Sequence, residues 1–193
     1  MTEMKRCPWS DSDELLKKYH DEEWGIPTFD DNKIFEMLVL EMFQSGLSWL
    51  TILKKREAFR EAFDNFNPEI VSKYDENKIN ELLENEAIIR NEMKIKSAIN
   101  NAKKYIEVQD KYGSFSKYIW SYVFDTPIIN PWSSPEEVPS KNPLSDKICE
   151  DMKKMGFTFI GSAIIYSFLQ SIGMINDHIL SCNFKYKDQK SMI

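Results

Sequence analysis

The chain has 193 residues, of which 42% are hydrophobic and 29% are charged, and its formal net charge is −6. This profile is typical of a globular protein with one domain, or two small ones sharing a core, and it disfavours a general polyanion binder, which is usually basic. The N-terminus has no apolar signal region, and serine and glutamine interrupt the most apolar stretch, residues 157–175. We therefore expect a buried helix there, no membrane span and a cytoplasmic location.

Apolar residues recur at helical spacing along most of the chain, and no segment alternates as a strand does. The first three helices are expected to be capped by Ser10 or Ser12, by Asp30 or Asp31, and by Ser48. Further helices are expected from Pro68, from Asp75, and over residues 88–105, 114–123, 146–154 and 159–173. A turn at 90–92 would leave a helical hairpin, and residues 125–143, rich in proline, are expected to be irregular. The sequence predicts an all-α protein in which residues 1–193 form one domain.

Both histidines and two of the three cysteines form two pairs at opposite ends of the chain: Cys7 with His20, and His178 with Cys182. Together they make a Cys₂His₂ set, the ligand set of a closed structural zinc site, and one ion would tie residues 1–25 to residues 174–185. On a helix, the i,i+4 spacing of His178 and Cys182 would place both on one face. The residues alone leave two alternatives open. These are scattered core thiols and surface imidazoles, or a Cys7–Cys182 disulfide, which a cytosolic location disfavours.

From Ile34 to Phe43 every residue is apolar except Glu36 and Glu41. Five residues of α-helix separate these carboxylates by about 140° around the axis, so one solvent-facing edge cannot easily serve both. We expect one to point inward, and Glu41 is the better candidate because a polar, glycine-containing segment, residues 44–49, follows it. A buried carboxylate needs donors or a cation. Glu41 is therefore either a structural group bonded to a helix cap or a pocket acid that recognises a cationic or donor-bearing ligand.

Four aromatic residues fall in the same quarter of the chain: Trp9, Tyr19, Trp24 and Trp49. Aromatic walls around a carboxylate suit a flat, positively charged group, through stacking and cation–π attraction. The alternative is that these side chains are plain core.

Several strings of residues make the chain recognisable. They are Cys-Pro-Trp at 7–9, Tyr-His-Asp-Glu-Glu-Trp-Gly at 19–25, Leu-Glu-Met-Phe-Gln-Ser-Gly-Leu-Ser-Trp at 40–49, Gly-Phe-Thr-Phe-Ile-Gly at 156–161 and Asn-Asp-His at 176–178. In this order they resemble the bacterial DNA-3-methyladenine glycosylase I family, and the likeness runs from Cys7 to Cys182. The resemblance implies a helix–hairpin–helix glycosylase fold and an enzyme that hydrolyses the N-glycosidic bond, releases 3-methyladenine and leaves an abasic site.

The resemblance also implies roles for individual residues. A structural zinc would be held by Cys7, His20, His178 and Cys182. The base would be recognised by Glu41, Tyr19 and Trp49, with Trp9 and Trp24 nearby, after it has left the stack. One departure is Leu16, which stands where the family has a tyrosine in the base pocket.

The implied partner is alkylated double-stranded DNA, bound by a monomer. Gly46 and Leu47 match the family's loop that presses into the duplex. The hairpin near 88–95, with Lys94 and Lys96, would hold the phosphate backbone, unless these lysines only belong to a solvated helix face. Two other functions remain as alternatives: a zinc-stapled protein that binds damaged DNA without cleaving it, supported only by Leu16, and a catalytic zinc hydrolase, which four protein ligands disfavour.

Overall fold

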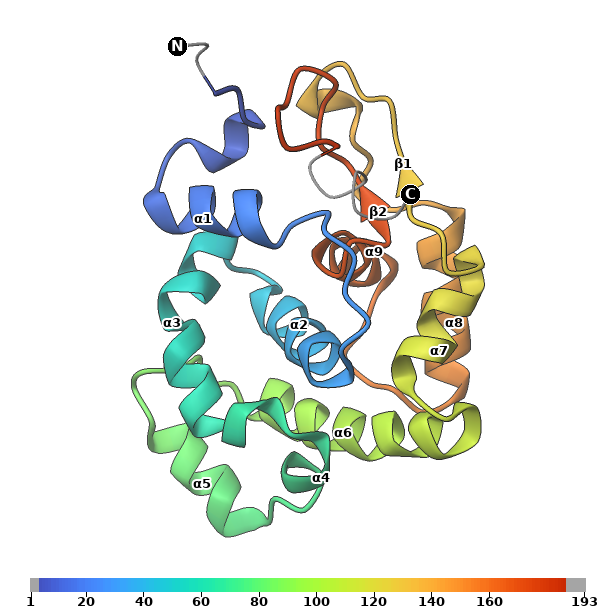
Figure 1. Cartoon of the computed structure of the whole chain (residues 1–193). Coiled ribbons are helices and arrows are strands. Elements are labelled where there is room, and N and C mark those ends of the chain that lie inside the picture. The colour runs from blue at the N-terminus through green and yellow to red at the C-terminus, as the bar shows by residue number, and fades with distance from the viewer. Residues whose placement is uncertain (1–3, 187–193) are drawn as a thin grey trace.

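The computed structural model describes residues 4–186, and these are mostly helical (Figure 1). The α-helices are, in chain order, α1 (Glu14–Glu22), α2 (Asp31–Gln44), α3 (Trp49–Ala62), α4 (Pro68–Val71), α5 (Glu76–Glu84), α6 (Glu92–Tyr112), α7 (Phe115–Trp120), α8 (Pro143–Lys154) and α9 (Ser162–Ser171). Short 3₁₀ helices occupy Pro8–Ser10, Asp64–Phe66, Ser121–Val123 and Pro135–Glu137. Within the described residues, no helix is both long and apolar enough to cross a membrane.

Most helices begin where the sequence predicts. Asp30, Ser48 and Asp75 accept hydrogen bonds from the first turns of α2, α3 and α5, as side chains at these positions commonly do. The prediction that Ser10 or Ser12 caps α1 is wrong. Asp13 caps it instead, because Ser10 is already buried in the preceding 3₁₀ helix and donates to the carbonyl of Cys7.

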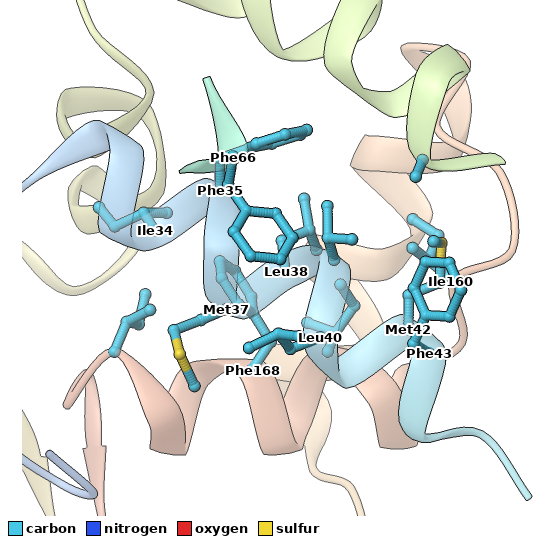
Figure 2. Close-up of a cluster of buried hydrophobic side chains, with 14 of the residues drawn as sticks. Ile34, Phe35, Met37, Leu38, Leu40, Met42, Phe43, Phe66, Ile160 and Phe168 are labelled. Atoms are coloured by element: carbon cyan, nitrogen blue, oxygen red, sulfur yellow. The ribbon is translucent and has the colours of Figure 1, made fainter. Parts of the chain in front are cut away.

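The α2 helix lies in the interior, and every residue from Ile34 to Phe43 is buried. It contacts α3, α6, α7 and α9. Figure 2 shows its apolar side chains among others from distant segments, such as Phe66, Ile160 and Phe168. A helix that is apolar on all sides is most stable when every side is shielded from water. The stretch from Ile34 to Phe43 has only two charged residues, which explains why it lies at the centre of the fold.

Two features depart from the expected all-α pattern. Residues Ile128–Ile129 (β1) and Ile175–Asn176 (β2) pair as short parallel strands, with Ile128 opposite Ile175. His178 and Cys182 do not lie on a helix, so helical i,i+4 spacing is not what brings them together. The chain leaves β2 in an irregular path and reaches Cys182 through a turn in which the Cys182 N–H donates to the Ile179 carbonyl at 2.9 Å.

The two ends of the described chain lie side by side (Figure 1). The backbone N–H of Lys5 donates to the side chain of Asn183, and the N–H of Asn183 donates to the carbonyl of Lys5. The N- and C-terminal segments therefore meet on one side of the molecule.

Gly173 marks a close crossing between the end of α9 and the segment after α1. Its φ is +73°, and a Cβ there would lie 2.1 Å from the backbone carbon of Ile26. We expect Gly173→Ala to destabilise the fold by more than about 3 kcal/mol, because a rigid backbone must move to accommodate the methyl group.

Gly113→Ala is the matched control. Gly113 has a φ of +88°, but its nearest neighbour would be the flexible Lys117 side chain at 3.4 Å. This variant should lose only the left-handed strain of about 1 kcal/mol. Urea unfolding of both variants measures the difference, and equal losses would show that the crossing is not tight.

Candidate functional site

A cavity of about 350 Å³ lies where the N-terminal quarter of the chain meets the C-terminal part. Its N-terminal lining consists of Cys7, Trp9, Tyr19, Trp24, Glu41, Gln44 and Trp49, and its C-terminal lining of Pro135, Val138, Ser167, Gln170, Asp177 and Ile179. The aromatic residues and Glu41, which the sequence predicts as a group, therefore face one space.

The aromatic walls are in mutual contact. Ring centroids lie 5.0 Å apart for Trp9 and Trp24, 6.4 Å for Trp9 and Tyr19, and 5.2 Å for Tyr19 and Trp49. Tyr19 projects from α1 and Trp49 is the first residue of α3. The two rings are thus fixed by different helices, and a flat ligand can meet aromatic faces from more than one direction.

Glu41 is buried, and no described residue donates a hydrogen bond to it; burial raises its pKa to about 8. The other carboxylate on α2, Glu36, is equally buried but accepts from Arg56 at 2.7 Å and from Arg60 at 2.9 Å. Burial also disfavours ionisation of Glu36, but these ion pairs outweigh it and lower its pKa. Glu36 is therefore the structural carboxylate, and Glu41 is the one left for a ligand.

Two further polar groups border the cavity and have no hydrogen-bond partner within residues 4–186. Burial, followed by the proximity of Glu41, raises the pKa of Tyr19 well above its usual value, so its phenol is neutral. The indole N–H of Trp49 is also buried and has no hydrogen-bond partner among the described residues. A ligand in the cavity would therefore meet free donors as well as a carboxyl group.

Asp177, a cavity residue that the sequence does not single out as a site residue, accepts hydrogen bonds from four side chains. Its Oδ1 accepts from Asn130 and from the Trp132 indole, both at 2.7 Å. Its Oδ2 accepts from the Tyr166 hydroxyl at 2.5 Å and from Gln170 at 2.7 Å. This carboxylate ties α9 to the irregular segment that forms the far wall, whereas the only sequence signal was its place beside His178.

The four predicted metal ligands come together. The donor atoms of Cys7, His20, His178 and Cys182 all lie within 4.8 Å of one another, and all four residues are buried. Cys182 Sγ is 3.4 Å from His178 Nδ1 and 3.5 Å from His20 Nε2, and Cys7 Sγ is 3.6 Å from His178 Nδ1. Tetrahedral zinc with sulfur and nitrogen ligands separates its donors by about 3.3 to 3.8 Å, so these three distances fit such an ion.

The remaining nitrogen of each histidine ring also has a partner. His20 Nδ1 lies 2.8 Å from an oxygen of Asp21, and His178 Nε2 lies 3.0 Å from the carbonyl of Trp24. Such contacts fix the tautomer that presents the opposite nitrogen to a metal. Both rings also pack on the cavity walls, His20 against Trp9 and His178 against Trp24.

The residues predicted to contact DNA differ in exposure. Leu47, which follows Gly46 in the loop between α2 and α3, is 39% exposed. Lys96 is exposed on α6 and pairs with Glu92 at 2.7 Å. Lys94 is buried and donates to two main-chain carbonyls, so in this structure it is not available to a phosphate. Leu16 is buried on α1 but is not among the residues that line the cavity.

Comparisons with known proteins agree with each other. Residues 9–186 match the family model described as methyladenine glycosylase. DNA-3-methyladenine glycosylase of Haemophilus influenzae is 41% identical over 180 residues, covering 93% of this chain and 97% of the relative. DNA-3-methyladenine glycosylase 1 of Escherichia coli is 40% identical over 179 residues, covering 93% and 96%. A solved structure of a 3-methyladenine DNA glycosylase I variant, in complex with 3-methyladenine, has a TM-score of 0.91 and 35% identity, covering 94% of this chain and 98% of its own.

The buried state of Glu41 predicts a pH dependence of stability. Its pKa of about 8 in the fold exceeds the ordinary value of 4.5. Between these values the folded chain keeps a proton that the unfolded chain releases, so stability falls as pH rises and levels off above about pH 8. The loss across this window should be roughly 3 to 5 kcal/mol.

Glu41→Gln is the control, because the amide has no proton to lose. Urea unfolding between pH 4 and pH 9 should show the variant gaining stability relative to the unmodified protein as the pH rises. Parallel stability curves would mean that Glu41 ionises in the folded state as easily as in the unfolded chain.

Proposed function

Since this chain belongs to the methyladenine glycosylase family and is a DNA repair glycosylase, we propose that it excises 3-methyladenine from alkylated double-stranded DNA. The damaged nucleotide would be flipped into the cavity and its N-glycosidic bond hydrolysed, leaving an abasic site. The observation that carries this proposal is the unpaired Glu41 among aromatic walls in the cavity. A relative with the same fold is known in complex with 3-methyladenine.

The cavity suits a cationic purine better than a neutral one. Methylation at N3 gives adenine a positive charge, so a carboxyl group and aromatic faces both attract it. Glu41 by itself is mostly protonated at neutral pH, because burial raises its pKa to about 8. A cationic base beside it would favour the ionised form, which can then accept from the exocyclic amine. Tyr19 and Trp49 would stack on the ring.

The chemical step needs little further help from the protein. The positive charge of the base already weakens the glycosidic bond, so the leaving group needs no added proton. The described residues that line the cavity include no lysine, the residue type that would form a covalent intermediate with the sugar. Water is therefore the nucleophile that we propose, and binding the flipped, labile nucleotide is the main contribution of the site.

On the DNA side, we propose that Gly46 and Leu47 form the wedge that fills the space left by the flipped base. The α5–α6 pair, joined through residues 85–91, would serve as the helical hairpin of the superfamily, with Lys96 toward the phosphate backbone. The exposure of Leu47 supports the first assignment.

We further propose that Cys7, His20, His178 and Cys182 hold a structural zinc ion. Four protein ligands would leave no position for a reactive water, so the ion would fasten the chain ends and not take part in hydrolysis. The supporting observations are the donor distances and the hydrogen-bonded outer nitrogens of both histidines.

The direct test is release of free bases from methylated duplex DNA, with 3-methyladenine and 7-methylguanine separated and counted. We expect selective release of 3-methyladenine. A folded, metal-loaded sample that binds abasic DNA but releases no base would instead support a damage-binding protein.

Glu41→Gln tests the role of the carboxyl group. Release should fall roughly 30- to 100-fold, because a charge-assisted hydrogen bond to the base is weakened. The unfolding free energy at pH 7 should not fall, since the amide, unlike the carboxyl group, does not have to take up a proton when the chain folds. Parallel losses of stability and release would show that Glu41 is only structural.

Cys182→Ala tests the metal site. The variant should lose bound zinc, measured by elemental analysis, and several kcal/mol of stability, measured by urea unfolding. Cys149→Ala is the matched control, because Cys149 is also a buried free thiol but lies on α8 and outside the metal group. It should keep a full complement of zinc. Unchanged zinc in Cys182→Ala would remove Cys182 from the ligand set.

A further inference from the structure

Lys94 makes contacts that a DNA-binding surface lysine would not. It lies in the first turn of α6, is only 6% exposed, and its Nζ donates to the carbonyls of Phe43 at 2.8 Å and Ser45 at 2.7 Å. These carbonyls belong to the end of α2 and to the residue just after it. The last carbonyls of a helix have no partner within the helix, and a cation placed there is also attracted by the negative end of the helix dipole.

The surroundings keep the ammonium group in this place. The Phe159 ring centroid lies 5.9 Å from Lys94 Nζ. The segment that carries Phe159 is itself bonded to α6, because Asn101 donates to the carbonyl of Thr158 and accepts from its N–H. Phe159 has a φ of +53°, a conformation that bulky residues rarely adopt without such support.

The Ser45 carbonyl belongs to the peptide group that joins Ser45 to Gly46, at the start of the wedge loop Gly46–Leu47. This loop has few other restraints. Gly46 has a φ of +81°, and a Cβ there would have nothing within 4 Å. Leu47 N–H donates to Gln44, a residue that also lines the cavity. Lys94 therefore connects the first turn of α6 to the point where the chain leaves the cavity wall and enters the loop.

We propose that Lys94 is a positioning residue that holds the Gly46–Leu47 loop ready for insertion through the Phe43 and Ser45 carbonyls, and that it is not a phosphate ligand. This inference rests on the proposed function, because it assigns a support for the wedge of that same reaction. Lys96, two residues further along α6, differs from Lys94 because its side chain is half-exposed and therefore accessible to solvent.

The test compares binding to a duplex that holds a tetrahydrofuran abasic analogue with binding to the same duplex undamaged, at several salt concentrations. Lys94→Met should keep the salt dependence of the unmodified protein, but its preference for the abasic duplex should fall about tenfold or more. A salt slope shallower by about one, with the preference retained, would identify Lys94 as a phosphate ligand and overturn the proposal.

Lys96→Met is the matched control. It removes an exposed charge that is proposed to face the phosphate backbone, so it should weaken binding to both duplexes alike and make the salt slope shallower, while the preference for the abasic duplex is kept. Where Lys94→Met does not fold, Lys94→Gln is measured in the same way, because its amide keeps N–H donors for the carbonyls without the charge.

A double-mutant cycle with Leu47→Ala separates positioning from a general loss of structure. If Lys94 acts through the loop, adding Lys94→Met to Leu47→Ala should cost little further preference. Additive losses would overturn the proposal. An unmodified protein that releases no 3-methyladenine and shows no preference for the abasic duplex would instead refute the proposed function itself.

Discussion

The α2 helix is buried within the fold, so each polar group on it needs a partner inside the protein or a ligand. This constraint shapes the site. At the start of α2, the Asp31 carboxylate accepts from Gln109 and from the backbone N–H groups of Phe115 and Ser116. In the middle, Glu36 is paired with arginines of α3, and at the end Lys94 bonds the free carbonyls. Glu41 alone among these groups has no partner from the described residues. Because the two other carboxylates of this apolar helix, Asp31 and Glu36, are paired, one carboxyl group is left for a ligand.

The Cys–His group supports the same cavity from its other side. It brings together residues more than 150 positions apart, and its imidazoles pack directly on Trp9 and Trp24. The loss of these contacts would disturb the aromatic walls as well as the chain ends. The chain ends and the cavity walls are thus joined by ring packing, and this packing explains why the group lies at the cavity.

The acidic surface is compatible with a DNA substrate because the proposed contacts are local. In the proposed mechanism the exposed Leu47 enters the duplex, and Lys94 would hold its loop in place from within the protein. A charged side chain can therefore serve DNA binding without touching DNA. The two lysines of α6, separated by a single residue, illustrate how burial changes the role of the same residue type.

The sequence by itself determined most of the helices, the Cys₂His₂ set, and the contrast between Glu41 and its apolar helix. Caps such as Asp30 and Ser48, apolar spacing and residue inventory are local properties, and local properties can be read along one chain. Only the tertiary structure decided that Asp177 and Gln170 border the cavity and that Lys94 is buried. It also decided that residues 178–182 are irregular. Each of these depends on partners far away in sequence, such as Asn130 for Asp177, Phe43 for Lys94 and Ile128 for Ile175. Long-range hydrogen bonds and strand pairing therefore decide the conformation of these segments more than residue spacing does. The reason is that a buried polar group must find a hydrogen-bond partner among the groups that the fold places beside it.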